Sequence, residues 1–274
     1  MTTMKKIALL VALATLCTNL MAQKKETRNL PAFQKIAFGG AGKVYVTQDS
    51  PQSVVLEGSE EILERYETKV EDGKLIVRPK DKWMNWNWSN EDEIIVYITV
   101  PVIEGLSVAG SGDLLVKNRI KTDKLSIKVS GSGNLQAEAD VKGSLEASVS
   151  GSGDVKISGT ANTFESNVSG SGDVNANVVC DSNSSFSISG SGKIILQGKA
   201  NLFQASISGS GSIRGRDFSV ETAKIKIAGS GSIELTVNQE IDASIAGSGD
   251  VRYAGNPKKV NSNAGGSGTV KKID

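Results

Sequence analysis

Ser148-Val149-Ser150-Gly151-Ser152-Gly153-Asp154-Val155-Lys156-Ile157 is the stretch that decides the fold, because close copies of it recur along the chain. Its Gly-Ser-Gly triplet returns every 18 to 21 residues, and Gly40-Ala41-Gly42 looks like a degenerate earlier copy. The nine triplets begin at Gly110, Gly131, Gly151, Gly170, Gly190, Gly209, Gly229, Gly247 and Gly266. A fixed period of this length is typical of solenoid proteins, in which each repeat is one supersecondary unit.

Apolar and polar residues alternate on both sides of each triplet. In the quoted copy Val149, Val155 and Ile157 are apolar, whereas Ser148 and Lys156 are polar. This alternation indicates short strands with one buried face. A single repeat cannot bury that face alone, so the repeats must stack with like positions aligned. We therefore predict an all-β protein, a right-handed parallel β-helix of about ten coils with one coil per repeat.

An antiparallel meander is the alternative architecture, with Gly-Ser-Gly as a three-residue hairpin loop. A hairpin tip faces solvent and has no reason to keep the same three residues in every copy. At the corner of a stacked coil each repeat lies against the next, so a Cβ has no room there. The β-helix is therefore the favoured prediction.

The period is interrupted before Gly110. Residues 71–74, with Asp72-Gly73 at their centre, lie between Thr68-Lys69-Val70 and Leu75-Ile76-Val77 and predict a β-hairpin. An open solenoid end leaves a sheet edge exposed, so this part of the chain is expected to cap the first coil. The predicted organisation is a capping β region over residues 23–105, with the hairpin and a tryptophan-rich loop, and a Gly-Ser-Gly solenoid over residues 106–274.

Residues 1–22 have the features of a secretory signal peptide. Lys5-Lys6 precedes an apolar run over residues 7–16, and the segment ends at Ala22. The run is too short to span a bilayer, which needs about 20 apolar residues. We expect cleavage after Ala22 and export to the periplasm, the outer cell surface or the medium, with no membrane span in the mature chain. A lipoprotein anchored at Cys17 is the alternative.

The composition argues against several classes of function. The chain has 31 Lys and Arg against 30 Asp and Glu, so no bulk positive charge favours nucleic acid. It has no histidine, which removes Ser-His-Asp and Cys-His nucleophiles and His-bearing zinc sites. Cys180 is the one cysteine of the mature chain and is expected to be buried and unreactive. These features predict a non-enzymatic protein without cofactor or metal.

All three tryptophans lie in one short segment, as Trp83, Trp86 and Trp88 among Asn and Asp residues. Aromatic rings beside amide and carboxylate groups are typical of a sugar-stacking platform or a protein interface. The competing interpretation is a loop that folds back and buries its rings over the solenoid end.

Acidic residues follow several triplets directly. They are Asp113, Asp154, Asp173 and Asp250, and Asn134 takes this place in another copy. Aligned acids could form a calcium ladder or the carboxylate pair of a glycosidase. Alternatively, each side chain hydrogen-bonds the corner backbone. Asp154 and Asp173 are kept as candidate binding residues.

Several segments resemble a known bacterial family, the putative auto-transporter adhesins, head GIN domain. The matching segments are residues 32–36, 42–48, 71–75, 96–101 and 253–257, together with the serial Gly-Ser-Gly-Asp units. The resemblance covers residues 32–270 and implies secretion and a β-helical fold of a kind common in Bacteroidetes.

The sequence is compatible with two functions from different classes. The first is an exported structural or interaction protein, adhesin-like, that binds a glycan or a cell-surface protein. The alternative is a carbohydrate-active β-helix enzyme, a lyase or a glycosidase. Such an enzyme would gather acids and bases on one face, whereas the outward position after each corner is mixed, as in Gln136, Lys156 and Asn175.

Overall fold

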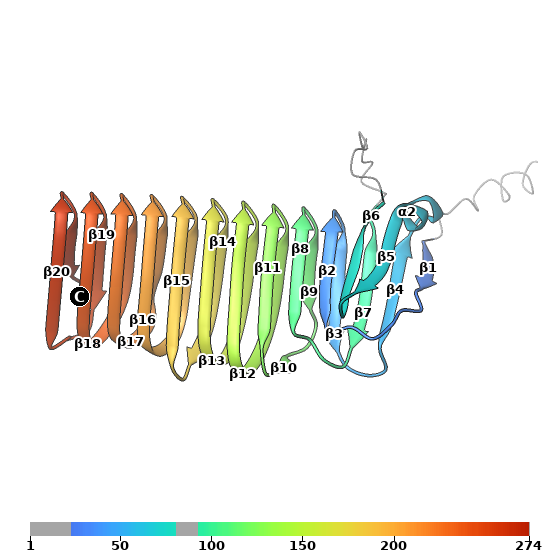
Figure 1. Ribbon diagram of the computed structural model, residues 1–274, viewed down its shortest axis with the longest axis horizontal. Coiled ribbons are helices and arrows are strands. Elements are labelled where there is room, and N and C mark those ends of the chain that lie inside the picture. The colour runs from blue at the N-terminus through green and yellow to red at the C-terminus, as the bar shows by residue number, and fades with distance from the viewer. Residues whose placement is uncertain (1–22, 81–92, 274) are drawn as a thin grey trace, which may run out of the picture.

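The computed structural model describes residues 23–80 and 93–273 and is a right-handed β-solenoid of about eight turns (Figure 1). In each turn one strand runs up the front face to a corner, and the next strand returns down the back face. The fold class predicted from the sequence is therefore confirmed, and the predicted ten coils are close to the observed number.

Strands on the front face run towards the corners, and strands on the back face run away from them. The front strands are β2 (Lys35–Gly40), β8 (Gly105–Gly110), β11 (Leu125–Gly131), β15 (Asn183–Gly190) and β20 (Lys259–Gly266). The back strands are β3 (Lys43–Gln48), β9 (Asp113–Val116), β14 (Asp173–Cys180), β19 (Asp250–Ala254) and β21 (Thr269–Lys272). Long strands pass from the back of one turn to the front of the next: β12 (Asn134–Gly151), β13 (Asp154–Gly170), β16 (Lys193–Gly209), β17 (Ser212–Gly229) and β18 (Ser232–Gly247). The short β10 (Ile120–Thr122) pairs with β12.

Successive turns pair in parallel with like positions in register. Gly131 of β11 lies opposite Gly151 of β12, and Gly151 lies opposite Gly170 of β13. The antiparallel meander is therefore wrong for the repeat region.

The corners stack so closely that only glycine fits. The φ of Gly151 is +114°, a conformation that L side chains rarely adopt. The Gly131 carbonyl oxygen of the previous turn accepts hydrogen bonds from the amides of Ser152 (2.8 Å) and Gly153 (2.9 Å). A Cβ added to Gly151 would lie 2.5 Å from that same oxygen. The row of corners is thus a ladder of stacked backbone.

The core is a single narrow column between the front and back faces. Alternate residues of every turn point into it, such as Val149, Val155 and Ile157, each at most 2% exposed. In the middle of the rod Phe164, Phe186, Phe203 and Phe218 fill this column; rings in contact lie 5.2 to 6.4 Å apart, centroid to centroid. Cys180 is buried in the same core, and burial raises the pKa of its thiol to about 12.

The Gly40-Ala41-Gly42 turn is part of the solenoid, since β2 and β3 pair in parallel with β8 and β9. On their other side lie β6 (Lys74–Pro79) and β7 (Ile95–Val100), again in parallel. The chain therefore leaves the solenoid after β3, builds further structure, and returns on both sides of the turn it left.

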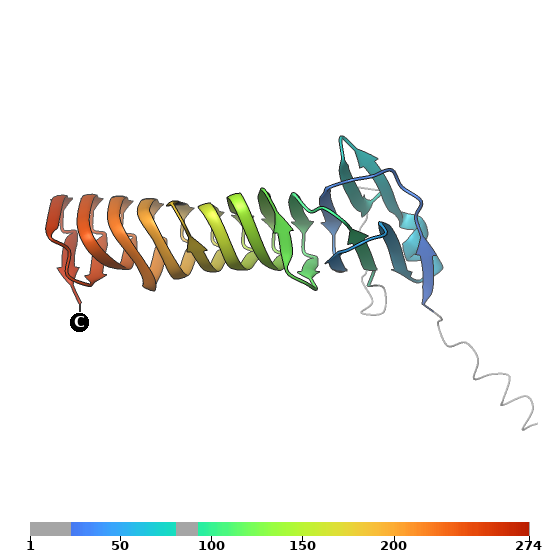
Figure 2. The ribbon, with the colours of Figure 1, turned by 90° about the horizontal axis from the view of Figure 1, so that it is seen from below.

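Further strands and a helix lie at this end of the solenoid, which we call the capped end (Figure 2). β5 (Tyr66–Glu71) pairs antiparallel with β6, β4 (Ser53–Gly58) with β7, and β1 (Lys24–Thr27) with β4. The helix α2 (Glu60–Arg65) lies between β4 and β5, with the hydroxyl of Ser59 accepting from the amide of Ile62 at its start. The predicted hairpin turn is formed, with positive φ at Asp72 and Gly73. The sheet continues across residue 105, where the boundary between the two regions stays a prediction.

The opposite end is open over the described residues. Every residue of β20 is exposed, and Val260, which aligns with buried Ile241 of the previous turn, is 41% exposed. Across residues 23–80 and 93–273 no helix is long and apolar enough to cross a membrane. The predicted signal peptide, residues 1–22, lies outside the described residues.

Candidate functional site

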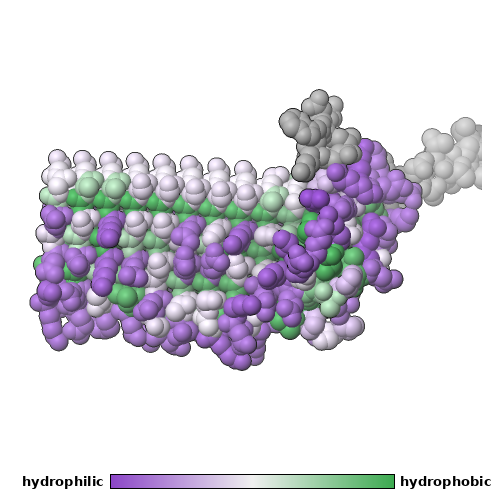
Figure 3. Space-filling model, in the orientation of Figure 1, coloured by the Kyte–Doolittle hydropathy of each residue, from purple (hydrophilic) through white to green (hydrophobic). Residues whose placement is uncertain are grey.

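Figure 3 shows the front face of the rod, where hydrophilic residues alternate with hydrophobic stripes that run along the rod, and the corner row forms a pale edge. The front strands point small residues outward next to the corners, such as Ser150, Ser169 and Ser189. The strip beside the corners on this face therefore offers few large side chains to a ligand. The back face is different.

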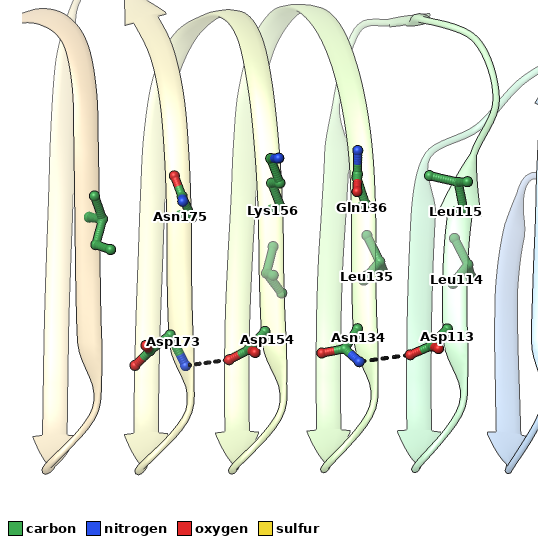
Figure 4. A pocket seen from close by; sticks show the side chains of 12 residues that line it. Asp113, Leu114, Leu115, Asn134, Leu135, Gln136, Asp154, Lys156, Asp173 and Asn175 are labelled. Atoms are coloured by element: carbon green, nitrogen blue, oxygen red, sulfur yellow. Dashed lines mark hydrogen bonds between the residues drawn. The ribbon is translucent and has the colours of Figure 1, made fainter.

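On the back face two columns of outward side chains run beside the corner row (Figure 4). The first column holds Asp113, Asn134, Asp154 and Asp173, which the parallel register places one turn apart. The second column lies two residues further along each strand. It holds Leu115, Gln136, Lys156, Asn175 and Ile195.

The acidic column is held by hydrogen bonds between neighbouring turns. Asn134 Nδ2 donates to Asp113 Oδ1 at 2.7 Å, and the backbone amide of Asp173 donates to Asp154 Oδ1 at 3.2 Å. Lys193 Nζ donates to Asp173 Oδ2 at 3.4 Å. Asp154 and Asp173 thus lie on adjacent turns, as the sequence spacing implied, and each is engaged along the column.

A shallow groove of about 480 Å³ is lined by these two columns over five turns. Its two ends are apolar, at Leu115 and Ile195, and its middle carries the amides, the carboxylates and the ammonium group of Lys156. Such a groove can hold an extended ligand by hydrogen bonds to its middle and apolar contact at its ends. Its carboxylates share one side of the groove and do not face one another across it.

Metal and nucleophile chemistry have little support in this geometry. Among residues 23–80 and 93–273 no three His, Cys, Asp or Glu side chains are grouped so that they could hold a metal ion. The pKa of Cys180 is raised by burial, which keeps its thiol protonated and unreactive.

Trp83, Trp86 and Trp88 lie outside the described residues. The strands on either side are described: β6 ends at Pro79 and β7 begins at Ile95, and both pair with strands of the Gly40–Gly42 turn. The tryptophan segment therefore joins two strands that flank the solenoid axis at its capped end.

An aromatic pair that the sequence analysis did not single out continues the second column of the groove. Tyr45 of β3 lies opposite both Leu115 of β9 and Tyr97 of β7. The two tyrosine rings stack with centroids 5.6 Å apart, and Tyr97 is 36% exposed. Each tyrosine stands between two buried residues, as in Val44-Tyr45-Val46. This alternation marks both as outward, but nothing in the sequence order makes them neighbours.

Charged groups surround the tyrosine pair. Lys117 Nζ lies 3.9 Å from the centroid of the Tyr45 ring, and Lys25 Nζ lies 5.3 Å from that of Tyr97. A hydrogen bond to Glu57 raises the pKa of the Tyr97 hydroxyl. Lys43 Nζ pairs with Glu93 Oε2 at 2.7 Å beside the same strands.

Comparisons with known proteins agree with the fold. The family model described as "Putative auto-transporter adhesin, head GIN domain" matches residues 32–192 and 181–257. A solved putative lipid binding protein from Parabacteroides distasonis is 26% identical, with a TM-score of 0.69, and the match covers 92% of this chain and 97% of that one.

Two solved putative adhesins share the fold at lower identity. One, from Parabacteroides distasonis, is 21% identical with a TM-score of 0.70, and the match covers 92% of this chain and 97% of that chain. The other, from Parabacteroides merdae, is 22% identical with a TM-score of 0.69, and the shares covered are 92% and 96%. No curated protein sequence matches the chain.

Proposed function

Because the chain belongs to the family described as putative auto-transporter adhesin, head GIN domain, we propose that it is an exported, non-enzymatic protein that attaches to a glycan or protein of a cell surface. The proposal places it in the periplasm, on the outer cell surface or outside the cell. It assigns the protein an adhesive surface and no chemical step.

The groove on the back face is the observation that carries this proposal. It runs over five turns of a rod whose turns are fixed in register by parallel pairing, so its side chains are held at constant spacing. A preformed row of polar groups loses little conformational entropy when a ligand binds. An adhesin needs such a surface and needs no catalytic centre.

The arrangement of the carboxylates supports binding over catalysis. A glycosidase needs two carboxyl groups that flank the scissile bond. Asp113, Asp154 and Asp173 stand in one line, and their oxygens accept hydrogen bonds from Asn134, the Asp173 amide and Lys193. The family and its solved relatives are described as adhesins or as a lipid binding protein. The alternative of a lyase or glycosidase is therefore less favoured.

The tryptophan segment remains a second proposed contact of the same function. Trp83, Trp86 and Trp88 are the chain's only tryptophans, and tryptophan is the residue type most often found as an energetic anchor in interfaces. The triple change Trp83→Ala, Trp86→Ala, Trp88→Ala is expected to weaken attachment while the β-sheet circular dichroism stays unchanged. Unfolding of this variant would instead assign the rings a structural role.

Attachment is tested with the mature chain from Gln23, labelled with a fluorophore and incubated with a glycan array and with intact epithelial cells. We expect saturable binding to at least one of them, reduced in Asp154→Asn, Asp173→Asn. Ser150→Ala, which changes only the front face, is the matched control and should bind like the wild type. No saturable binding to either would overturn the proposed function. Fractionation of the native cells checks export separately.

A further inference from the structure

We propose that Tyr45 and Tyr97, together with the groove that continues from them, bind a neutral polysaccharide of hexopyranose units lying along the solenoid axis. The inference deepens the proposed function, on which it rests, by naming the ligand class and the residues that hold it. The sugar rings would pack against the exposed edges of the two tyrosines, and the polar middle of the groove would hydrogen-bond the sugar hydroxyl groups.

The tyrosine pair is unusual because the other aromatic side chains of residues 23–80 and 93–273 pack into or against the core. All six phenylalanines and Tyr66 are buried in the core. Tyr97 and Tyr45 instead stand side by side on the outer surface, locked outward by the buried Val96 and Val44 that precede them. The two rings stack on each other with centroids 5.6 Å apart, so they present their adjoining edges as one aromatic ridge.

The strand register aligns the two tyrosines with the second column of the groove, so the aromatic ridge and the groove are continuous. Tyr97, Tyr45, Leu115 and Gln136 occupy one column on four successive strands, spaced by the ~4.8 Å distance between paired strands. That spacing is close to the length of one pyranose ring. A linear hexose chain can therefore keep the same relation to each strand as it crosses the turns.

The polar groups beside this column suit hydroxyl groups. Asp113 and Asn134 form a hydrogen-bonded pair on one side of it, and Gln136 and Asn175 present exposed amides further along. Carboxylates accept and amides both donate and accept, so together they can satisfy sugar hydroxyls, which do both. Apolar contact with the tyrosines and Leu115 supplies affinity here, and these few polar groups supply orientation.

The charges around the pair favour a neutral ligand. Lys43 is paired with Glu93 at 2.7 Å, and Lys25 with Glu57 at 3.3 Å. Lys117 lies against the Tyr45 ring as a cation–π contact. Beyond the tyrosines the column of Asp113, Asp154 and Asp173 would repel a polyanion. Lys156 is the one lysine among the groove's lining residues, against the three carboxylates of Asp113, Asp154 and Asp173, so the groove carries a net negative charge that disfavours an acidic polysaccharide.

Affinity electrophoresis and titration calorimetry with soluble mannan and dextran test the site, with polygalacturonate as the acidic counterpart. We expect the wild type to bind mannan or dextran and not polygalacturonate. The double change Tyr45→Ala, Tyr97→Ala is expected to weaken binding at least tenfold. Tyr97→Phe keeps the ring and should bind nearly as the wild type. Arg252→Ala, an outward change near the far end of the rod, is the matched control.

Several results would overturn the inference. They are binding of polygalacturonate in preference to both neutral polymers, binding of phosphatidylcholine vesicles with no polysaccharide bound, and unchanged mannan and dextran affinity in the double variant. If the double variant does not fold, as judged by its thermal melt, Gln136→Ala is measured in its place. Unchanged affinity of Gln136→Ala for mannan and dextran would also overturn the site.

The inference and the proposed function can fail separately. Cell attachment that survives the double tyrosine change overturns the tyrosine site and leaves the function standing. Binding to mannan or dextran without any binding to cells or to the array supports the site and overturns the adhesive function.

Discussion

At the scale of single residues, two separate constraints make glycine necessary at each corner. The first glycine of the triplet, such as Gly151, combines positive φ with contact to the carbonyl of the previous turn. The third, such as Gly153, has no positive φ, yet a Cβ there would also meet the backbone of the previous turn. Gly73 in the hairpin shows the reverse, since its φ is +69° but no atom lies within 4 Å of an added Cβ. The cost of a positive φ and the cost of a crowded Cβ can therefore be measured separately, at different glycines of this chain.

Three substitutions measure these two constraints. Gly151→Val is expected to lower the free energy of unfolding by several kcal/mol, because it violates both. Gly153→Ala tests lack of space alone and should cost less than Gly151→Val. Gly73→Ala tests positive φ alone and should cost about 1–2 kcal/mol. Equilibrium denaturation gives all three values. A loss below about 0.5 kcal/mol for Gly151→Val, the size of an ordinary surface change, would contradict the stacked corner.

At the scale of the strands, alternation decides which side chains form the core and which form the groove. Each strand sends every second residue inward, and parallel register aligns these residues into columns. In the middle of the rod phenylalanines from neighbouring inward columns meet in the core: the Phe186 ring lies 5.5 Å from that of Phe164, 5.2 Å from Phe203 and 6.2 Å from Phe218. Because rings from three other strands pack on Phe186, a rearrangement of one strand cannot fill the space that removal of its ring would leave.

The change Phe186→Ala is expected to destabilise the protein by about 3–5 kcal/mol, as the removed ring leaves a cavity that the fixed strand spacing prevents from closing. Ser185→Ala, an exposed neighbour on the same strand, is the control and should stay within about 0.5 kcal/mol of the wild type. Denaturant titration of both variants checks the difference. Equal stability of the two would mean that the core relaxes around the gap.

At the scale of the whole molecule, the rod is a stack in which each turn contacts mainly its two neighbours. The capped end finishes this stack with antiparallel strands and a helix, whereas the other end finishes with the exposed strand β20. Lys259 and Lys272 stand on the last turn. Lysine on an edge strand discourages edge-to-edge association. The molecule thus protects its two ends by different means.

Removing one whole turn should therefore leave a folded rod. Deleting residues 132–151 joins Gly131 to Ser152 and keeps an intact Gly-Ser-Gly corner in register. We expect unchanged β-sheet circular dichroism and a smaller denaturant m-value, since one turn less of surface is exposed on unfolding. Deleting residues 132–141, half a turn, offsets every later strand and should prevent folding. If both deletions fold equally well, stability does not depend on the stacking of whole turns.

The sequence alone determined the solenoid. Close stacking forbids a Cβ at the corners and alternation separates core from surface, so the triplets and the period of 18 to 21 residues predict the turn, its two faces and the acidic column at Asp154 and Asp173. The lack of room for a Cβ at the corner and the alternation of core and surface residues are both local and recur in every turn. Both therefore appear as a repeating pattern in the sequence.

Only the tertiary structure decided the order of turns at the capped end. The chain leaves after β3, forms β4, α2 and β5, and comes back with β6 and β7 on the outer side of β2 and β3 and with β8 and β9 on the inner side. This brings Tyr97 beside Tyr45 and ahead of Leu115, although sequence order would place Tyr45 at the end of the column. The physical reason is that both edges of the Gly40–Gly42 turn need hydrogen-bonding partners, and such long-range pairing leaves no periodic signal in the sequence.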